Sequence, residues 1–267
     1  MTEHVSLRIE EHVAHVVLNR AEKYNAVNRG VIDGLLAAGE ALTEDRNVRA
    51  VVLSGAGDNF CAGIDLAMFQ SAEPVFGPEA LKPQPGNIAN YFQRAATIWR
   101  EVPVPVIAAL HGICYGAGLQ IAFGADLRIA APDCKLSVME VKWGIVPDMG
   151  MTVTARGLLR PDQLKELALT GRVFDGQTAL ELGAVTRLDT APLEAATALA
   201  AQIASRSPDA TASIKALLND GLTLPPAEAL RLEAELQMAL LGSANQGEAV
   251  AANLGRREPE FGPRKAG

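Results

Sequence analysis

Residues 101–150 read EVPVPVIAALHGICYGAGLQIAFGADLRIAAPDCKLSVMEVKWGIVPDMG, and this stretch decides the fold. It opens with the β-branched residues Val104, Val106 and Ile107, punctuated by Pro103 and Pro105, which predicts a short buried strand. Residues 111–112 turn the chain, and the glycines of 116–118 permit a close backbone approach before the apolar helix expected at 119–123. A strand, a glycine turn and a helix start leave backbone N–H groups unpaired at the helix N-terminus, where negative charge is favoured.

Two carboxyl groups follow in the same stretch. Glu140 and Asp148 stand among apolar neighbours, which include Trp143, Ile145 and Val146. A carboxylate in apolar surroundings needs a partner or a chemical role. The sequence therefore predicts a backbone pocket that stabilises an anion and faces one or two acids.

Composition narrows the class of protein. With 267 residues, of which 49% are hydrophobic, the chain can bury a large core and is not mainly disordered. Its net charge of −7 argues against a broad nucleic-acid surface. Cys61, Cys114 and Cys134 are odd in number and lack CxxC spacing, so we expect no metal site and a reducing, cytoplasmic setting.

The sequence predicts neither a signal peptide nor a membrane span. The N-terminus, MTEHVSLRIEEH, is charged from the start, which is not typical of a signal peptide. Residues 102–125 carry no Asp, Glu, Lys or Arg, but prolines, glycines, a histidine and a glutamine interrupt them. We expect soluble core and no membrane partner.

The strand, glycine turn and helix of the deciding stretch occur a second time upstream. Residues 5–9 and 13–18 alternate apolar and polar positions, as in a hairpin, and Asn28 is a candidate N-cap for a helix. A buried strand at 49–53 then leads through a glycine-rich turn at 54–66 into a short helix. The recurrence predicts a spiral of repeated ββα units.

The remaining segments complete an α/β fold with two domains. Residues 74–86 hold four prolines, as in a lid or specificity loop. Beyond this loop the sequence predicts a strand at 184–186 and helices at 87–100, 162–170, 176–182 and 192–205. Further helices are predicted at 209–219, 226–241 and 245–255. We expect a catalytic core over 1–206 and a helical oligomerisation domain over 207–267, with the leucines of 226–241 facing another subunit.

Several motifs together resemble the enoyl-CoA hydratase/isomerase (crotonase) family. They are AEKYNAVN, FCAGIDL, PVIAALHGICYGAGLQIAFGADLRIA, MEVKWGIVPDMG, LTGRVFDGQTALELGAVTRL and the final EAVAANLGRREPEFGPR. They cover nearly the whole chain in the family's order. The resemblance implies a crotonase-like ββα spiral with a C-terminal helical domain, acyl-CoA thioester substrates of fatty acid metabolism, and a homotrimer or dimer of trimers. It implies no cofactor, since coenzyme A is part of the substrate.

The resemblance also assigns a site. The family's two oxyanion-hole amides fall on Ile64 and Ala117, which lie at the two expected helix starts. Two such N–H groups stabilise an enolate oxygen where its charge develops. Coenzyme A would be held by the loop around Lys23 and Ala26 and by a second set comprising Ala62, Gly63, Ile64, Asp65 and Leu66, beside Gly116 and Ala117. The structural alternative is two tight turns without chemistry.

The acids decide between reactions, and here the chain departs from the hydratase pattern. The loop glutamate of hydratases matches Glu140, but their helix glutamate falls on Gln120, which cannot exchange protons. Asp148 stands where dienoyl-CoA isomerases place an aspartate, although these isomerases also have an acid at the Gln120 position.

Structural alternatives stay open for several of these residues. Glu140 could form a salt bridge with Lys142 or an arginine, and Asp148 could cap a helix at 149–156. His111 is expected to serve the turn and Cys61 to serve packing.

Three functions follow from these residues. The first is double-bond isomerisation by proton transfer through Glu140, with or without Asp148. The second is hydration of a 2-enoyl-CoA (a lyase reaction), with Glu140 activating water and Gln120 only orienting it. The third is an acyl-CoA binder without turnover.

Overall fold

A six-stranded sheet organises the molecule, of which the computed structural model describes residues 2–69, 77 and 79–265. The strand order is β1-β2-β3-β4-β6-β9; β1 and β2 pair antiparallel and the other neighbours pair parallel. The strands are β1 (Val5–Glu10), β2 (Val13–Leu18), β3 (Ala50–Gly55), β4 (Val106–Leu110), β6 (Leu127–Ala130) and β9 (Arg187–Leu188). Because parallel strands end at the same edge, the loops that follow β2, β3 and β4 converge there.

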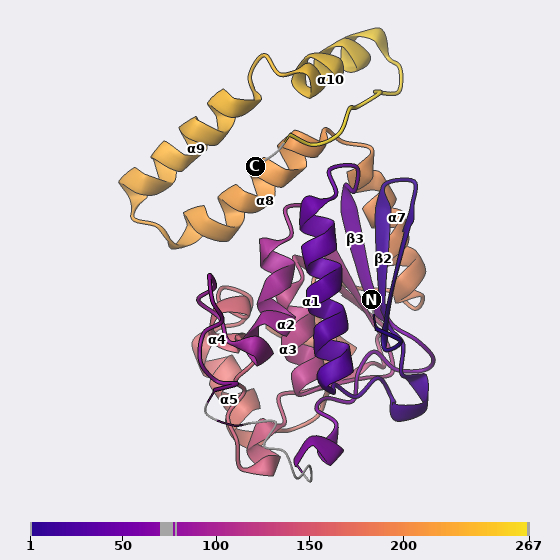
Figure 1. Cartoon of the computed structure of the whole chain (residues 1–267), viewed down its shortest axis with the longest axis vertical. Helices are drawn as coiled ribbons and strands as arrows, with labels where there is room; N and C mark the ends of the chain where they lie inside the picture. Colours follow the sequence, from indigo (N-terminus) through magenta and orange to yellow (C-terminus); the bar gives the residue numbers. More distant parts are fainter. Residues whose placement is uncertain (1, 70–76, 78, 266–267) are drawn as a thin grey trace.

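Helices cover both faces of this sheet, as the near-continuous apolar strands require. On one face, Val51 and Leu53 of β3 belong to the core that packs beneath α1 (Arg29–Glu44), α2 (Tyr91–Glu101) and α3 (Ala117–Gly124) (Figure 1). The alternate residues, Ala50 and Val52, face α7 (Pro192–Ala204) on the opposite side. Small residues at a spacing of four along α7 (Ala196, Ala200 and Ala204) form its buried side.

The first residues of α1 and α2 can be compared with the predicted helix starts. Asn28 caps α1 as predicted, since its Oδ1 accepts from the Val31 N–H at 3.0 Å. Helix α2 begins at Tyr91 and not at residue 87, because Asn90 and Gln93 form a reciprocal capping box at 2.9 Å in each direction.

The strand expected at 184–186 lies elsewhere. Gly183 ends α6 (Gly176–Leu182) in a left-handed conformation, and the next N–H, from Ala184, bonds back to the Ala179 carbonyl at 2.8 Å. Ala184 therefore still belongs to the end of the helix. Hydrogen bonding to β6 begins at Thr186, and the strand β9 starts at Arg187, after the predicted range.

A second sheet, of three strands, begins directly after the turn at residues 111–112. It consists of β5 (Ile113–Tyr115), β7 (Lys135–Ser137) and β8 (Phe174–Asp175). A parallel bridge between Cys61 and Cys114 joins this sheet to the segment after β3. The two glycine-rich turns are therefore held side by side. Helices α4 (Met151–Thr154) and α5 (Pro161–Thr170) follow β7 in the chain.

The C-terminal helices gather at one end of the molecule (Figure 1). They are α8 (Pro208–Asp220), α9 (Pro226–Leu240) and α10 (Ala244–Gly255), close to the predicted ranges. Lys215 of α8 is buried and ties it to the core, with Nζ 2.7 Å from the Trp99 carbonyl, 3.0 Å from the Val104 carbonyl and 2.8 Å from Asp126 Oδ2. Helix α9 contains no buried residue. The domain boundary at residue 207 stays a prediction.

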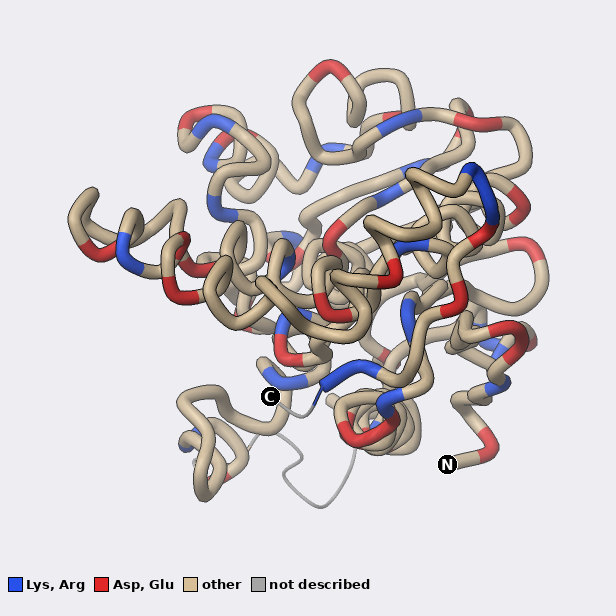
Figure 2. Tube along the Cα trace, turned by 90° about the horizontal axis from the view of Figure 1, so that it is seen from above, with Lys and Arg blue, Asp and Glu red and all other residues tan. Residues whose placement is uncertain are grey.

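Two further predictions concern membrane-spanning helices and the proline-rich loop. None of the helices in the described ranges combines the length and apolar character that crossing a bilayer requires. Of the proline-rich loop at 74–86, residues 74–76 and 78 lie outside the described residues. Acidic and basic residues are interspersed along the described trace (Figure 2).

Candidate active site

A cavity of about 890 Å³ opens where the loops after β2 and β3 meet the start of α3. All residues that the sequence assigned to the site line it. They are Lys23, Ala26, Ala62, Gly63, Ile64, Asp65, Leu66, Gly116, Ala117, Gln120, Glu140 and Asp148. Residues far apart in the sequence are thus brought to one place.

The first of the two candidate amides belongs to Ile64, in an extended segment. Val27 pairs with this segment on both sides of Ile64: its N–H donates to the Gly63 carbonyl and its carbonyl accepts from the Asp65 N–H, each at 2.8 Å. In such a parallel bridge the N–H of the residue between these two bonds points away from the partner strand. Among the described residues the Ile64 N–H has no hydrogen-bond partner.

The second candidate amide, from Ala117, is the first N–H of α3, and it too has no partner within the described ranges. Gly116 precedes it with φ 49° and ψ −118°, a conformation that strongly favours glycine. A Cβ on Gly63, where φ is +97°, would lie 3.0 Å from the Tyr115 carbonyl oxygen and 3.8 Å from the Ala117 nitrogen. The two turns therefore touch through glycine backbone, and the two amides lie close together.

One expectation about these amides is wrong. Ala117 does lie at a helix start, but Ile64 precedes a single 3-10 turn, Leu66–Phe69, by two residues. Its N–H is oriented by the bridge to Val27 and not by a helix N-terminus.

Glu140 and Gln120 form a hydrogen-bonded pair in the wall of the cavity. Gln120 Nε2 donates to Glu140 Oε1 at 2.6 Å, and Gln120 Oε1 accepts from the Met149 N–H at 2.9 Å. Because a backbone N–H can only donate, it fixes which end of the amide faces Glu140. Glu140 Oε2 is buried and has no hydrogen-bond partner among the described residues. This oxygen is the one left to interact with a bound molecule.

The environment of both acids favours their neutral forms. Burial raises the pKa of Glu140, and the Asp148 carboxylate raises it further, against the lowering effect of hydrogen bonds that include the one from Gln120. Burial also raises the pKa of Asp148. Raised carboxyl pKa values in a cavity suit groups that take up and release protons near neutral pH.

The structural alternatives for these acids do not hold. Within the described part of the chain no Lys, Arg or His nitrogen lies within 4.0 Å of Glu140, so it has no salt bridge there. Helix α4 is capped by Gly150 in a left-handed conformation without a side-chain bond, so Asp148 is not its N-cap.

His111 and Cys61 behave as expected. His111 Nε2 lies 2.9 Å from the Gly57 carbonyl oxygen, so its ring joins its own turn to the glycine-rich turn after β3. Cys61 is fully buried, and burial raises the pKa of its thiol to about 12, so it is packed and protonated.

An apolar wall completes the cavity and was largely missed from the sequence. Trp143, Ile145 and Val146 were noted only as neighbours of the acids, yet all line the cavity, and between 42% and 70% of their surfaces is exposed. The signal was an apolar run that is followed by proline and continues no helix. The other missed lining residues are Glu22, Tyr24, Phe69, Leu81, Phe92, Met139 and Met149.

This arrangement defines an α/β protein with an open apolar cavity. Two backbone amides without partners among the described residues line it, together with the carboxyl groups of Glu140 and Asp148. The family model described as "Enoyl-CoA hydratase/isomerase" matches residues 8–264. The chain belongs to the enoyl-CoA hydratase/isomerase family.

Proteins similar to this chain include some named as isomerases and some named as hydratases. The mitochondrial Delta(3,5)-Delta(2,4)-dienoyl-CoA isomerase of Homo sapiens is 33% identical over 270 residues, which cover 95% of this chain and 80% of the relative. A probable enoyl-CoA hydratase of Bacillus subtilis is 30% identical over 260 residues, covering 96% and 98%. The crystal structure of an enoyl-CoA hydratase from Bacillus anthracis superposes with a TM-score of 0.88 at 28% identity and covers 97% of this chain and 98% of that one. This solved structure shares the crotonase fold that the sequence predicted.

Proposed function

We propose that this protein isomerises the double bond of an unsaturated acyl-CoA by proton transfer at Glu140. The observation that carries the proposal is the engagement of Gln120 at both polar ends, by Glu140 and by the Met149 N–H. An amide held in this way still has one N–H and one lone pair, but it cannot take a proton from a water molecule or give one to the substrate. The site thus lacks the second acid that hydration would use at this position.

The reaction runs through an enolate. Ionised Glu140 takes a proton from the carbon next to the thioester carbonyl, and the electron pair moves onto the carbonyl oxygen. The Ile64 and Ala117 N–H groups donate to this oxygen and stabilise its negative charge. Reprotonation farther along the chain, at the γ or ε carbon, shifts the double bond. Glu140 can return its own proton, which leaves it ionised as at the start. Alternatively, protonated Asp148 supplies the proton, and the proton that Glu140 took must then pass to Asp148 before the next turnover.

The apolar wall and the cavity volume support an acyl-CoA as the ligand. The exposed side chains of Trp143, Ile145 and Val146 offer a surface for the hydrocarbon part of the substrate. Lys23 and Ala26, on the facing loop, are our candidates for contact with coenzyme A. The names of the dienoyl-CoA isomerase relatives point to the same class of substrate.

Hydration of a 2-enoyl-CoA is the second candidate, and the hydratase names of other relatives favour it. In that case Glu140 would activate water without a second carboxylate on α3, and Asp148 would be the remaining acid. A binder without turnover is the third.

A panel of 2-enoyl, 3-enoyl and 3,5-dienoyl thioesters separates these functions. Mass spectrometry detects the addition of water, and ultraviolet absorbance detects a change in conjugation at constant mass. We expect isomerisation of the 3-enoyl or dienoyl substrates to exceed hydration, with Glu140→Gln as the matched inactive control. Faster water addition than isomerisation would favour the second candidate, and no turnover of any substrate would favour the third.

A further inference from the structure

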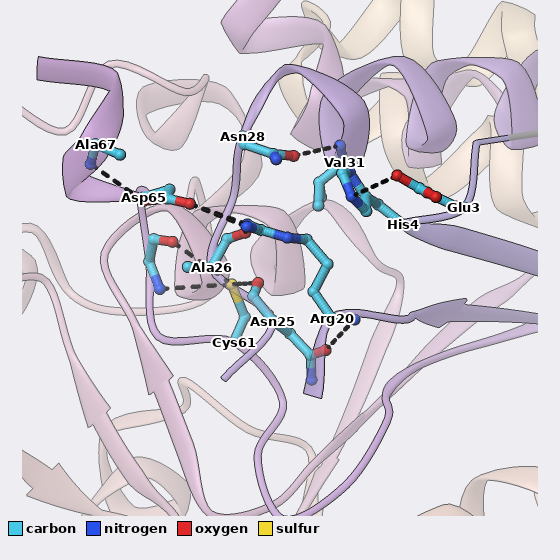
Figure 3. Close-up of polar contacts among 11 residues, drawn as sticks. Glu3, His4, Arg20, Asn25, Ala26, Asn28, Val31, Cys61, Asp65 and Ala67 are labelled. Atoms are coloured by element: carbon cyan, nitrogen blue, oxygen red, sulfur yellow. Dashed lines mark hydrogen bonds and ion pairs between the residues drawn. The ribbon is translucent and has the colours of Figure 1, made fainter. Parts of the chain in front are cut away.

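A partly buried ion pair connects the two loops that follow β2 and β3. Arg20, two residues beyond β2, directs both of its terminal nitrogens at Asp65 Oδ2, each at 3.1 Å (Figure 3). The same guanidinium donates to the Ala26 carbonyl at 2.7 Å. The Arg20 side chain is 10% exposed and the Asp65 side chain 20%. One side chain therefore holds the first loop and the second loop together at the edge of the cavity, which Asp65 also lines.

The second carboxylate oxygen of Asp65 is used as well. Asp65 Oδ1 accepts from the Ala67 N–H at 3.1 Å, which fixes the carboxylate relative to its own backbone (Figure 3). Since both oxygens are engaged, the rotation of this side chain is defined from two sides. The backbone of residue 65 is in turn joined to Val27.

The first loop is anchored independently by Asn25, which is fully buried. Its side chain accepts from the Arg20 N–H at 2.9 Å and donates to the carbonyls of Ala56 and Asn59 at 2.9 and 2.7 Å. The Cys61 thiol lies 3.1 Å from the Asn25 carbonyl, also between the two loops (Figure 3). The loop that carries Val27 is therefore rigid where it meets the second loop.

Ile64 is the residue that this network surrounds. Asp65 follows it directly, and Val27 bonds to the residues on both of its sides. The direction of the Ile64 N–H is set by the peptide planes that these contacts hold. An amide that stabilises an oxyanion is effective only when it is already aimed at the position of that oxygen.

We propose that Arg20 and Asp65 are positioning residues that aim the Ile64 N–H at the thioester carbonyl oxygen. This inference rests on the proposed function, which assigns that amide to the oxyanion. Neither side chain takes part in proton transfer. Their effect is on the stabilisation of the enolate and less on the affinity for the acyl-CoA.

Arg20→Lys and Asp65→Asn test the proposal. A lysine cannot contact Asp65 and the Ala26 carbonyl as a planar fork does, and an asparagine removes the charge at nearly constant volume. Arg94→Lys is the matched control, because Arg94 is 16% exposed and pairs with Glu40 at 3.0 Å outside the cavity lining. All variants are compared by thermal unfolding, so that loss of stability is measured separately.

The diagnostic measurement is the absorbance of a bound probe. An arylacrylyl-CoA has an ultraviolet band that moves to longer wavelength when its thioester carbonyl is polarised by hydrogen bonds. We expect a clear red shift with the wild-type protein, less than half of it with Arg20→Lys and Asp65→Asn, and the full shift with Arg94→Lys. Because loss of one oxyanion donor lowers kcat by about 10²–10³, a misaimed donor should lower it by about 10–100-fold, with KM within about threefold.

Two outcomes would overturn the proposal in distinguishable ways. The full red shift in both variants would show that the ion pair supports stability alone, while the proposed function stands. A wild-type protein that binds the probe without any shift would remove the oxyanion role of Ile64 itself, and with it the reason for positioning.

Discussion

Glu140 has one oxygen occupied by Gln120 and the other, Oε2, buried without a partner among the described residues. Replacing it by glutamine keeps the shape and the contact with Gln120 but removes the proton acceptor. We expect Glu140→Gln to lower kcat by about 10²–10⁴, the usual contribution of a general acid or base, with acyl-CoA affinity changed only a few-fold. Steady-state kinetics and calorimetric titration check this. A variant with unimpaired turnover would mean that Glu140 is purely structural.

The same substitution should stabilise the protein in a pH-dependent way. The pKa of Glu140 is raised in the folded state by burial, so its contribution to stability is present below the unfolded pKa and is lost as pH rises through the folded pKa. Glutamine does not titrate. Each unit by which the folded-state pKa is raised lowers the free energy of unfolding at high pH by about 1.4 kcal/mol. For a chain of this size, each kcal/mol changes Tm by about 2–4 °C. We expect the Tm advantage of Glu140→Gln to be small near pH 4 and largest near pH 8.

Glu166→Gln is the control for this measurement. The hydrogen bond from Arg172 lowers the pKa of Glu166, so any stability it contributes is lost as pH falls and not as it rises. A Tm difference for Glu140→Gln that stays constant between pH 4 and pH 8 would contradict the titration argument.

Gln120 is the residue at which the reaction should be adjustable. Gln120→Glu would place a carboxylate 2.6 Å from Glu140 Oε1 and leave the Met149 N–H as a donor to it. Two carboxyls at this distance share one proton, which separates their pKa values and provides both an acid and a base. We expect hydration to rise relative to isomerisation on the same thioester panel. Family-typical hydration by the wild type, unchanged in the variant, would contradict this expectation.

At the level of the elements, Lys215 joins α8 to the core. Its three partners include the Trp99 carbonyl in the last turn of α2 and the Asp126 carboxylate. Lys215→Met removes the donor and leaves these acceptors buried, which costs about 3–5 kcal/mol by analogy with broken buried ion pairs. We expect the denaturation midpoint to fall accordingly. Lys82→Met, which breaks an exposed pair with Glu79, should stay within about 0.5 kcal/mol.

Local sequence patterns predicted most of these elements because the information is local. The alternation of residues 13–18 and the Asn28 cap each depend on neighbours within a few positions. The misplaced strand at 184–186 and the role of Arg20 have a different origin. The left-handed cap at Gly183 lets the end of α6 continue into residues whose composition favours a strand. Arg20 contacts Asp65 only because β2 and β3 pair in the fold. Contacts of that kind need the three-dimensional register.

The site residues were predictable by type and position, yet their orientation was not. That Glu140 and Ile64 would lie in one cavity followed from the motifs that carry them. That Gln120 would be held from both sides did not, since the Met149 N–H is contributed by a segment 29 residues away.

For the whole molecule, the C-terminal helices suggest an assembly. Large apolar side chains stand exposed there: Leu222 at 80%, Leu230 at 64%, Met238 at 74% and Leu254 at 81%. Apolar groups of this size in one region commonly mark a protein interface. We expect a homotrimer, single or doubled, in sedimentation at micromolar concentration. Leu230→Glu with Met238→Glu should shift it toward smaller species, and Glu233→Gln on the same helix should not. A wild-type protein sedimenting only at 28.1 kDa would contradict the assembly.

The Met149 N–H has a consequence for how such a site can change over generations. A backbone N–H donates to a carboxylate oxygen as readily as to an amide oxygen, so the Met149 N–H can hold either glutamine or glutamate at residue 120. The codons for these two amino acids differ at a single base. One nucleotide substitution can therefore change the number of proton-exchanging groups in the cavity, while the backbone that positions Glu140 stays the same.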